Sequence, residues 1–274
     1  MMQKGKLYIL GVLCFALGTA YGQTTKEFKW PKGAKAAFAL TYDDGLPSHV
    51  NTVAPMLKKY NFKATFYPAI NSPSLYDDIA QWKNLAIAGH ELGNHTVYHP
   101  CQKSKAGMEW VEDHYNLDTY TVKQLTQELE LANTALKALD GKEARTFAYP
   151  CAHYLAGGES YKSFVVSEFL AARGSSETQT ALLPVAKIDL HDVPSWAPNG
   201  HSAEELIAYI QKVIDHKTFG SFTFHGIGAA HMVVATSAHE KMLQFLDANR
   251  DAIWVASFQE ITAYIKSERA KTEK

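Results

Sequence analysis

Short apolar runs alternate with segments of helical periodicity along most of the chain. An apolar run of about four to eight residues is typical of a buried strand, and apolar residues three and four apart are typical of an amphipathic helix. Strands are predicted at residues 34–41, 64–69, 146–149, 186–190, 220–224 and 253–255. Helices are predicted at residues 47–60, 78–88, 121–139, 160–171, 202–215, 237–249 and 258–266.

This alternation predicts an α/β fold in a single domain. A strand followed by a helix, repeated about seven times, implies parallel strands joined by crossover helices. A barrel and a doubly wound open sheet both satisfy the pattern, and in both folds ligands bind at the carboxyl ends of the strands. The chain has 274 residues, of which 46% are hydrophobic, and shows no internal repeat or linker. We therefore expect one domain at residues 23–267, with a charged tail at 268–274.

The first residues have the layout of a secretory signal peptide. Lys4 and Lys6 precede an apolar stretch at residues 7–20, and small residues at Ala20 and Gly22 match a cleavage site. The apolar run is short for a retained membrane anchor, which is the alternative. We therefore expect residues 1–22 to be removed and the mature protein to be periplasmic or secreted, without stable membrane insertion.

Charge excludes some classes of partner. The formal net charge is -1, from 27 basic and 28 acidic residues. Such a balance produces no field that would attract nucleic acid or an anionic membrane. A neutral glycan or a small molecule fits this charge better.

Two adjacent carboxylates follow the first predicted strand. Residues 41–45 read TYDDG, so Asp43 and Asp44 lie where the strand ends. One carboxylate can bind a metal while its neighbour faces a substrate. The Asp-Gly pair is also common in simple turns, which is the alternative interpretation.

Three histidines complete a candidate site. His95 and His99 are four residues apart, so they can face one side of a helical turn and offer two nitrogens to one cation. His225 ends the strand predicted at 220–224 and lies at the same end of the sheet. The chain contains 12 histidines, so a chance pair or a histidine buried for packing remains an alternative.

Together these residues suit metal-assisted hydrolysis of an amide or ester. Asp44, His95 and His99 form a two-histidine, one-carboxylate set that can hold a divalent ion with open coordination positions. Such an ion lowers the pKa of water, Asp43 can act as general base, and His225 can protonate the leaving group. Zinc suits these ligands, and manganese, cobalt or iron could occupy the same set.

The motifs resemble those of the polysaccharide deacetylases of the NodB-homology type, carbohydrate esterase family four. TYDDG, then His-Thr-x-x-His, then Phe-His-Gly occur in that order within residues 34–264. The resemblance implies a distorted (β/α) barrel, usually of seven strands. It also implies one divalent metal and an acetylated glycan as substrate, with removal of N-acetyl groups favoured over O-acetyl groups. The roles given above to the five site residues are those the family implies.

The third family motif is altered here. Ala148 stands where the family has an arginine that pairs with the base, and we expect Arg173, or else Arg145, to replace it. The resemblance places three residues along the substrate groove: Tyr149, Pro150 and Cys151. Cys151 occupies the position of a groove-lining aromatic residue, and its backbone N–H could bind the oxyanion.

The fourth motif matches only in part. Ser195 replaces a carboxylate that would orient His225, so Asp192 or Asp189 is expected to substitute. Trp196 keeps its place as a candidate wall for the acetyl group. Because the second and third motifs should lie at one rim, a Cys101–Cys151 disulfide is predicted to brace the site.

Two other functions stay open at this point. One is a metal amidohydrolase acting on a small non-sugar amide. The other is a glycan-binding protein with impaired catalysis, suggested by the altered third and fourth motifs. The sequence leaves the oligomeric state undetermined.

Overall fold

The computed structural model describes residue 1 and residues 28–174 and 182–272. The predicted signal peptide therefore lies, apart from Met1, outside the described residues. The strands are β1 (Ala36–Asp43), β2 (Thr65–Tyr67), β3 (Glu91–Leu92), β4 (Phe147–Ala148), β5 (Leu155–Ala156), β6 (Glu159–Ser160), β7 (Ala172–Arg173), β8 (Phe219–Phe224) and β9 (Ile253–Ala256). The helices are α1 (Ala54–Lys59), α2 (Pro73–Asp77), α3 (Ile79–Ile87), α4 (Val122–Asp140), α5 (Lys162–Glu168), α6 (Ala203–Asp215), α7 (Thr236–Ala248) and α8 (Phe258–Thr272).

Parallel strand pairings close into a ring. β3, β2, β1 and β8 are neighbours in that order, and β4 pairs with β7. Isolated parallel bridges join Asn94 to Phe147, Arg173 to Val193, and Trp196 to Phe222. The ring of described segments is therefore β1, β2, β3, β4, β7, residues 193–196 and β8, which pairs again with β1. β9 pairs with the first half of β1 and lies outside this ring.

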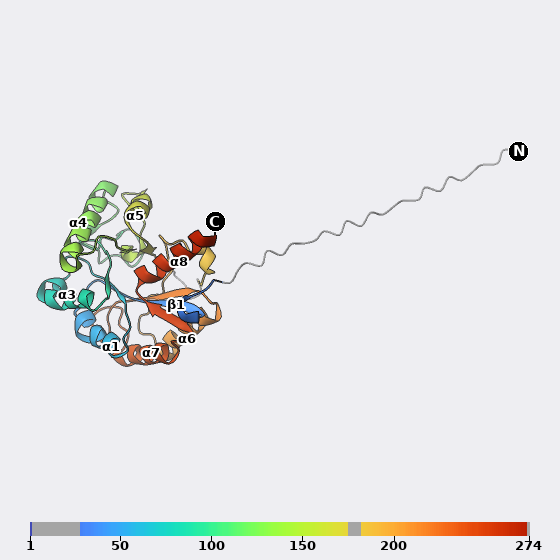
Figure 1. Ribbon diagram of the computed structural model, residues 1–274. Helices are drawn as coiled ribbons and strands as arrows, with labels where there is room; N and C mark the ends of the chain where they lie inside the picture. Colours follow the sequence, from blue (N-terminus) through green and yellow to red (C-terminus); the bar gives the residue numbers. More distant parts are fainter. Residues whose placement is uncertain (2–27, 175–181, 273–274) are drawn as a thin grey trace.

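Helices surround the central strand β1 (Figure 1). Every residue of β1 is buried, as expected of a parallel strand covered on both faces. The main core cluster combines β1 and β8 with apolar residues of α1, α3, α6 and α7. α4 and α6 begin with capping boxes at Thr121 and Ser202, which explains why both helices start where the sequence predicts.

Several predicted elements differ in the structure. Residues 186–190 do not form a strand; a 3-10 turn occupies Val185–Lys187. The helix predicted at 160–171 is shorter, and the chain is extended at β7 before residue 174. β3 and β7 were missed because two-residue strands carry no periodicity. α8 continues to Thr272 rather than ending at 266, and Arg269 on it donates to the Ile188 carbonyl at 2.8 Å.

Among residues 28–174 and 182–272, no helix combines the length and apolar character needed to cross a bilayer.

Candidate active site

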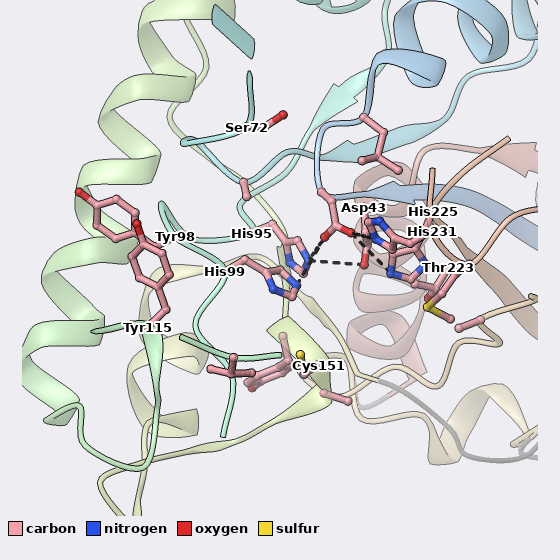
Figure 2. A pocket seen from close by; sticks show the side chains of 18 of the residues that line it. Asp43, Ser72, His95, Tyr98, His99, Tyr115, Cys151, Thr223, His225 and His231 are labelled. Atoms are coloured by element: carbon pink, nitrogen blue, oxygen red, sulfur yellow. Dashed lines mark hydrogen bonds and ion pairs between the residues drawn. The ribbon is translucent and has the colours of Figure 1, made fainter. Parts of the chain in front are cut away.

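One cavity of about 880 Å³ lies where the strands of the ring end. Asp43 is the last residue of β1, Arg173 ends β7, and His225 follows β8. All three line the cavity together with Asp44, His95 and His99. The polar residues that the sequence singled out on separate strands therefore meet at one edge of the ring (Figure 2).

Three nitrogen and oxygen atoms converge in a way that suits a divalent cation. Asp44 Oδ1 lies 3.5 Å from His95 Nε2 and 3.4 Å from His99 Nε2. Asp44 Oδ1 and His95 Nε2 are buried, yet neither has a hydrogen-bond partner. Buried polar atoms without partners are rare, and a bound ion is one of the explanations for them. A carboxylate and two imidazoles make a donor set that fits zinc or a similar ion.

Backbone and helix contacts hold the two histidines. His95 Nδ1 donates to the Ala148 carbonyl at 2.8 Å, which leaves Nε2 directed toward Asp44. Glu128 on α4 accepts the backbone N–H groups that follow Thr96, from Val97 at 3.0 Å and Tyr98 at 2.8 Å. The predicted helical turn is wrong, because residues 93–100 form an irregular loop.

Two of the candidate ligands have left-handed backbone conformations. φ is 74° at Asp44 and 53° at His99. Residues other than glycine seldom adopt such angles, which often mark functional sites held by their surroundings.

The ionisation of these groups favours cation binding. Burial raises the pKa of Asp44, but His99, His231, His95 and His225 together hold it well below its usual range. Burial lowers the pKa of His99 to about 4, so its ring is neutral at neutral pH. Burial also disfavours charge on His95, yet Asp43 and Asp44 raise its pKa overall. The same two carboxylates would attract a divalent cation.

Arg173 occupies the place that Ala148 leaves vacant. Its guanidinium donates to Asp43 Oδ2 and to Thr223 Oγ1, and both side chains of the ion pair are buried. Ala148 and Arg173 are register partners in the β4–β7 pair, so the arginine comes from the neighbouring strand. Arg145, the other candidate, instead pairs with Asp140 at 2.7 Å.

His225 lies at the site without a carboxylate on its Nδ1 atom. Nδ1 is buried and has no hydrogen-bond partner, while Nε2 is 3.9 Å from Asp44 Oδ2. Burial lowers the pKa of His225, although Asp44 and Asp43 act in the opposite direction.

The carboxylates expected to orient His225 lie elsewhere. Asp192 accepts from Tyr154 Oη at 2.9 Å and lies 3.6 Å from Lys162 Nζ. Asp189 also pairs with Lys162, at 2.8 Å. Ser195, in the place of the family carboxylate, shares a 2.7 Å hydrogen bond with Thr223 instead.

His231 is a site residue that the sequence analysis missed. Its Nε2 lies 2.7 Å from Asp44 Oδ2, whereas His95 and His99 lie near the other oxygen of that carboxylate, Oδ1. The loop that carries it folds back tightly, and Gly226 donates to the His231 carbonyl at 3.0 Å. A side chain at Gly226 would meet the Ala229 carbonyl oxygen, so the glycine permits this turn. The only signal in the sequence was a second histidine six residues after His225.

The expected groove residues divide into two groups. Tyr149 and Cys151 line the cavity, whereas Pro150 is buried in the turn beside them. Trp196 does not line the cavity and packs against Tyr209 and Phe222 in the core.

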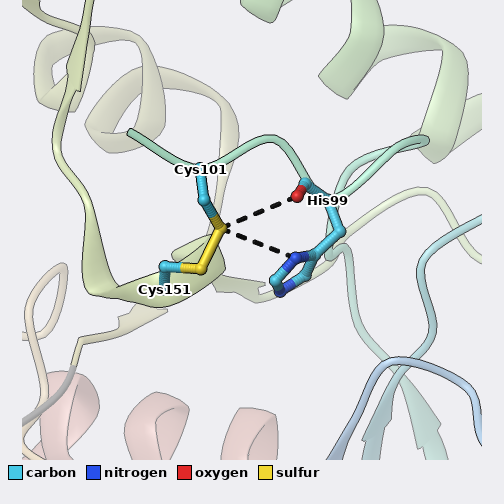
Figure 3. A group of neighbouring side chains, drawn as sticks. All are labelled: His99, Cys101 and Cys151. Carbon is cyan, nitrogen blue, oxygen red and sulfur yellow. Dashed lines mark hydrogen bonds between the residues drawn. A yellow bond between two sulfur atoms is a disulfide. The ribbon is translucent and has the colours of Figure 1, made fainter. Parts of the chain in front are cut away.

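The predicted disulfide is present and braces the second and third motifs. Cys101 and Cys151 are bonded, with their Cα atoms 5.9 Å apart. The Cys101 sulfur lies 3.6 Å from Nδ1 of His99 (Figure 3). The bond therefore ties the loop of a candidate metal ligand to the turn at Cys151.

Comparison with known proteins shows which family the chain is similar to. Residues 31–157 match the model of the polysaccharide deacetylase family. This match confirms the resemblance of the motifs to that family. The chain is 25% identical to a gellan lyase from a Bacillus species over 264 residues, 86% of this chain and 10% of that protein. It is 39% identical to a Bacillus cereus peptidoglycan-N-acetylglucosamine deacetylase over 67 residues, 24% of each. The chain thus spans a small part of these relatives.

Solved structures share the fold. A Mycobacterium smegmatis protein assigned as a polysaccharide deacetylase superposes with a TM-score of 0.65 at 16% identity, covering 89% of this chain and 94% of that one. A family 4 acetyl xylan esterase from Clostridium thermocellum, in complex with a cobalt ion, gives 0.52 at 18% identity, covering 83% and 91%. These likenesses confirm the predicted α/β fold, in which the parallel pairings of the described segments close into a ring.

Proposed function

We propose that the protein is a metal-dependent hydrolase that removes N-acetyl groups from a polysaccharide or oligosaccharide. One observation carries the proposal. The buried, unpartnered atoms Asp44 Oδ1 and His95 Nε2 converge with His99 Nε2 beside a second carboxylate, Asp43. A cation-binding set next to an unligated base is what water activation requires.

Asp44, His95 and His99 would hold the metal. A divalent cation, when bound there, supplies Lewis-acid polarisation of the acetyl carbonyl and lowers the pKa of water. Zinc is the ion we propose, since two imidazoles and one carboxylate with open positions match its catalytic sites.

Asp43 is the general base in this proposal. Arg173 binds its Oδ2, which leaves Oδ1 buried and without a hydrogen-bond partner at the cavity. Oδ1 is the atom that would take the proton from the attacking water. The charge-assisted hydrogen bond from Arg173 fixes the orientation of this carboxylate.

His225 would protonate the leaving nitrogen of the sugar. It lines the cavity together with His231. The backbone N–H of Cys151, a residue that lines the cavity, is the donor that we assign to the oxyanion. These assignments fit the cleavage of an amide, and the name of the Bacillus cereus relative favours N-acetylglucosamine over O-acetyl sugars.

Export of the protein is part of the proposal. The Cys101–Cys151 disulfide supports it, because disulfides persist in oxidising compartments and a glycan of the cell surface or the exterior would be met there.

Acetate release tests the proposed reaction and its substrate. The protein, depleted of metal and then supplied with zinc, would be assayed on chitin oligomers, peptidoglycan fragments and acetylated xylan. We expect release from the N-acetylated glycans and its loss in Asp43→Asn. Release from acetylated xylan alone would replace the N-acetyl assignment with an O-acetyl one.

A second function has one observation in its favour. His225 Nδ1 has no hydrogen-bond partner, so the acid lacks the carboxylate that would raise its pKa. A glycan-binding protein with impaired catalysis would show binding of the oligomers without release of acetate.

A further inference from the structure

Three aromatic side chains stand at the cavity without a task in the proposed chemistry. Trp110 is 61% exposed and Tyr98 is 42% exposed, although both line the cavity. Tyr115 lines it as well and stacks on Tyr98, with ring centroids 5.1 Å apart and planes 17° apart. Large aromatic surfaces left in water beside a reaction centre usually serve a ligand.

These rings adjoin the candidate metal ligands. The Trp110 ring lies 6.5 Å from the His99 ring, with the two planes 29° apart. Tyr98 and Tyr115 lie side by side beyond His95 and His99 as seen from Asp43 (Figure 2). The aromatic wall, defined as Tyr98, Trp110 and Tyr115, therefore begins one side chain away from the place where the acetyl group would react.

The segment that carries Trp110 is held at its base. Cys101 and Asn116 form a parallel backbone bridge, and Leu117 donates to the Cys101 carbonyl at 2.9 Å. Lys103 N–H donates to Asn116 Oδ1 at 3.0 Å, and the disulfide at Cys101 ties the same point to Cys151. The ends of the loop at residues 101–117 are thus fixed, so little ordering entropy is lost when a ligand binds to it.

The charges of the cavity select among ligands. Its described lining includes the carboxylates of Asp43, Asp44 and Glu112 but no lysine, and its arginine, Arg173, is already bound to Asp43. A polyanionic glycan would find no unpaired guanidinium or ammonium group in this lining. A neutral sugar ring, which has apolar C–H faces and needs no counter-charge, fits an aromatic surface.

We propose that the aromatic wall is a sugar-binding subsite, with Trp110 stacking on the pyranose ring next to the acetylated unit. This inference rests on the proposed function and narrows it: the substrate is a neutral glycan of at least two sugar units, and a free monosaccharide leaves the subsite empty. Stacking on one aromatic ring contributes enough to change affinity by about tenfold.

Binding, measured apart from turnover, tests this subsite. The zinc-loaded full chain would be titrated with tri-N-acetylchitotriose by calorimetry, and the same samples would be assayed for acetate release. We expect Trp110→Ala to weaken binding and raise KM by about tenfold with kcat and zinc affinity unchanged. Trp110→Phe should recover most of the loss. Tyr76→Ala removes a side chain that is 68% exposed but does not line the cavity, and it serves as the matched control.

The outcomes separate the subsite from the reaction. Equal trisaccharide affinity for wild type and Trp110→Ala, or no binding of trisaccharide by the wild type, overturns the subsite even if acetate is released. Equal kcat/KM on N-acetylglucosamine and on the trisaccharide also overturns it. Binding that depends on Trp110 without any acetate release would leave the subsite standing and reject the deacetylase.

Discussion

Arg173, at the end of β7, binds the carboxylate of Asp43, at the end of β1, and both side chains are buried. The arginine enters the site from the strand next to Ala148, the position at which the family resemblance implies an arginine. The register of β4 against β7 pairs Ala148 with Arg173, so the guanidinium reaches the same carboxylate from one strand further around the ring. The contact that the resemblance implies for position 148 is therefore made by Arg173 instead.

Replacement of this arginine should impair the base more than the metal site. For Arg173→Gln we expect kcat/KM to fall by about 10²-fold, because Asp43 loses the group that orients it. Stability should fall by about 3–5 kcal/mol, since a buried carboxylate is left without its partner. Zinc titration of the same variant is the control. A loss of zinc binding equal to that of Asp44→Asn would mean that Arg173 supports the ligands rather than the base.

His231 should act on metal affinity. Its hydrogen bond to Asp44 Oδ2 leaves Oδ1 directed toward His95 and His99. Loss of such an outer contact typically costs about 10–100-fold in metal affinity, which we expect for His231→Ala. His231→Gln keeps a hydrogen-bond donor and should recover part of the lost metal affinity. Unchanged zinc affinity in His231→Ala, measured by competition with a chelating dye, would contradict this role.

The disulfide should stabilise both the fold and the site. Its two cysteines are 50 residues apart, and a loop of that length corresponds to about 4 kcal/mol in the chain-entropy account. The double variant Cys101→Ser, Cys151→Ser should lose about that much in urea unfolding and bind zinc more weakly, because His99 lies against the bond. Identical stability of the double variant and the wild type would show that the bond does not constrain the chain.

Stability should decline as pH falls below about 6.5. Burial lowers the pKa of His239 to about 3, and its Nε2 is 2.8 Å from Tyr42 Oη. The unfolded chain takes up a proton near pH 6.5 that the folded chain does not. The contribution of His239 is therefore complete above the unfolded pKa and is lost as pH falls toward the folded pKa, by up to about 1.4 kcal/mol per pH unit.

Urea unfolding between pH 5 and 7 checks this dependence. In His239→Gln the slope of the unfolding free energy against pH should decrease by up to about 1.4 kcal/mol per pH unit, which corresponds to one proton. Residual slope is expected from His90, whose pKa burial lowers to about 4. An unchanged slope in the variant would show that His239 does not titrate as described.

The sequence predicts which residues meet at the cavity where those residues end strands. Asp43, Asp44 and His225 follow recognisable apolar strands, and parallel strands deliver such residues to one edge of the barrel. Arg173 and the Cys101–Cys151 pair were anticipated from the family resemblance, because altered motif positions needed replacements, and the structure contains both contacts.

The other features of the site depend on tertiary contacts that hydrophobic periodicity does not encode. His231 reaches Asp44 through a loop that folds back at Gly226, and Glu128 holds residues 97 and 98 from a distant helix. Trp196, in the ring segment at residues 193–196, packs on Tyr209 and Phe222 and does not line the cavity. Asp192 contacts Tyr154 and Lys162 instead of His225. The composition of a short extended segment does not show in which direction its side chains point.

Zinc binding and acetate release, measured on the same samples, test the central claim most directly. Wild type, Asp43→Asn and Asp44→Asn would be depleted of metal, titrated with zinc and assayed on tri-N-acetylchitotriose. The account predicts that wild type binds one zinc and releases acetate only when loaded. It further predicts that Asp43→Asn binds zinc as tightly but releases none, and that Asp44→Asn loses both. Acetate release at the wild-type rate by metal-depleted protein, or by Asp43→Asn, would contradict it.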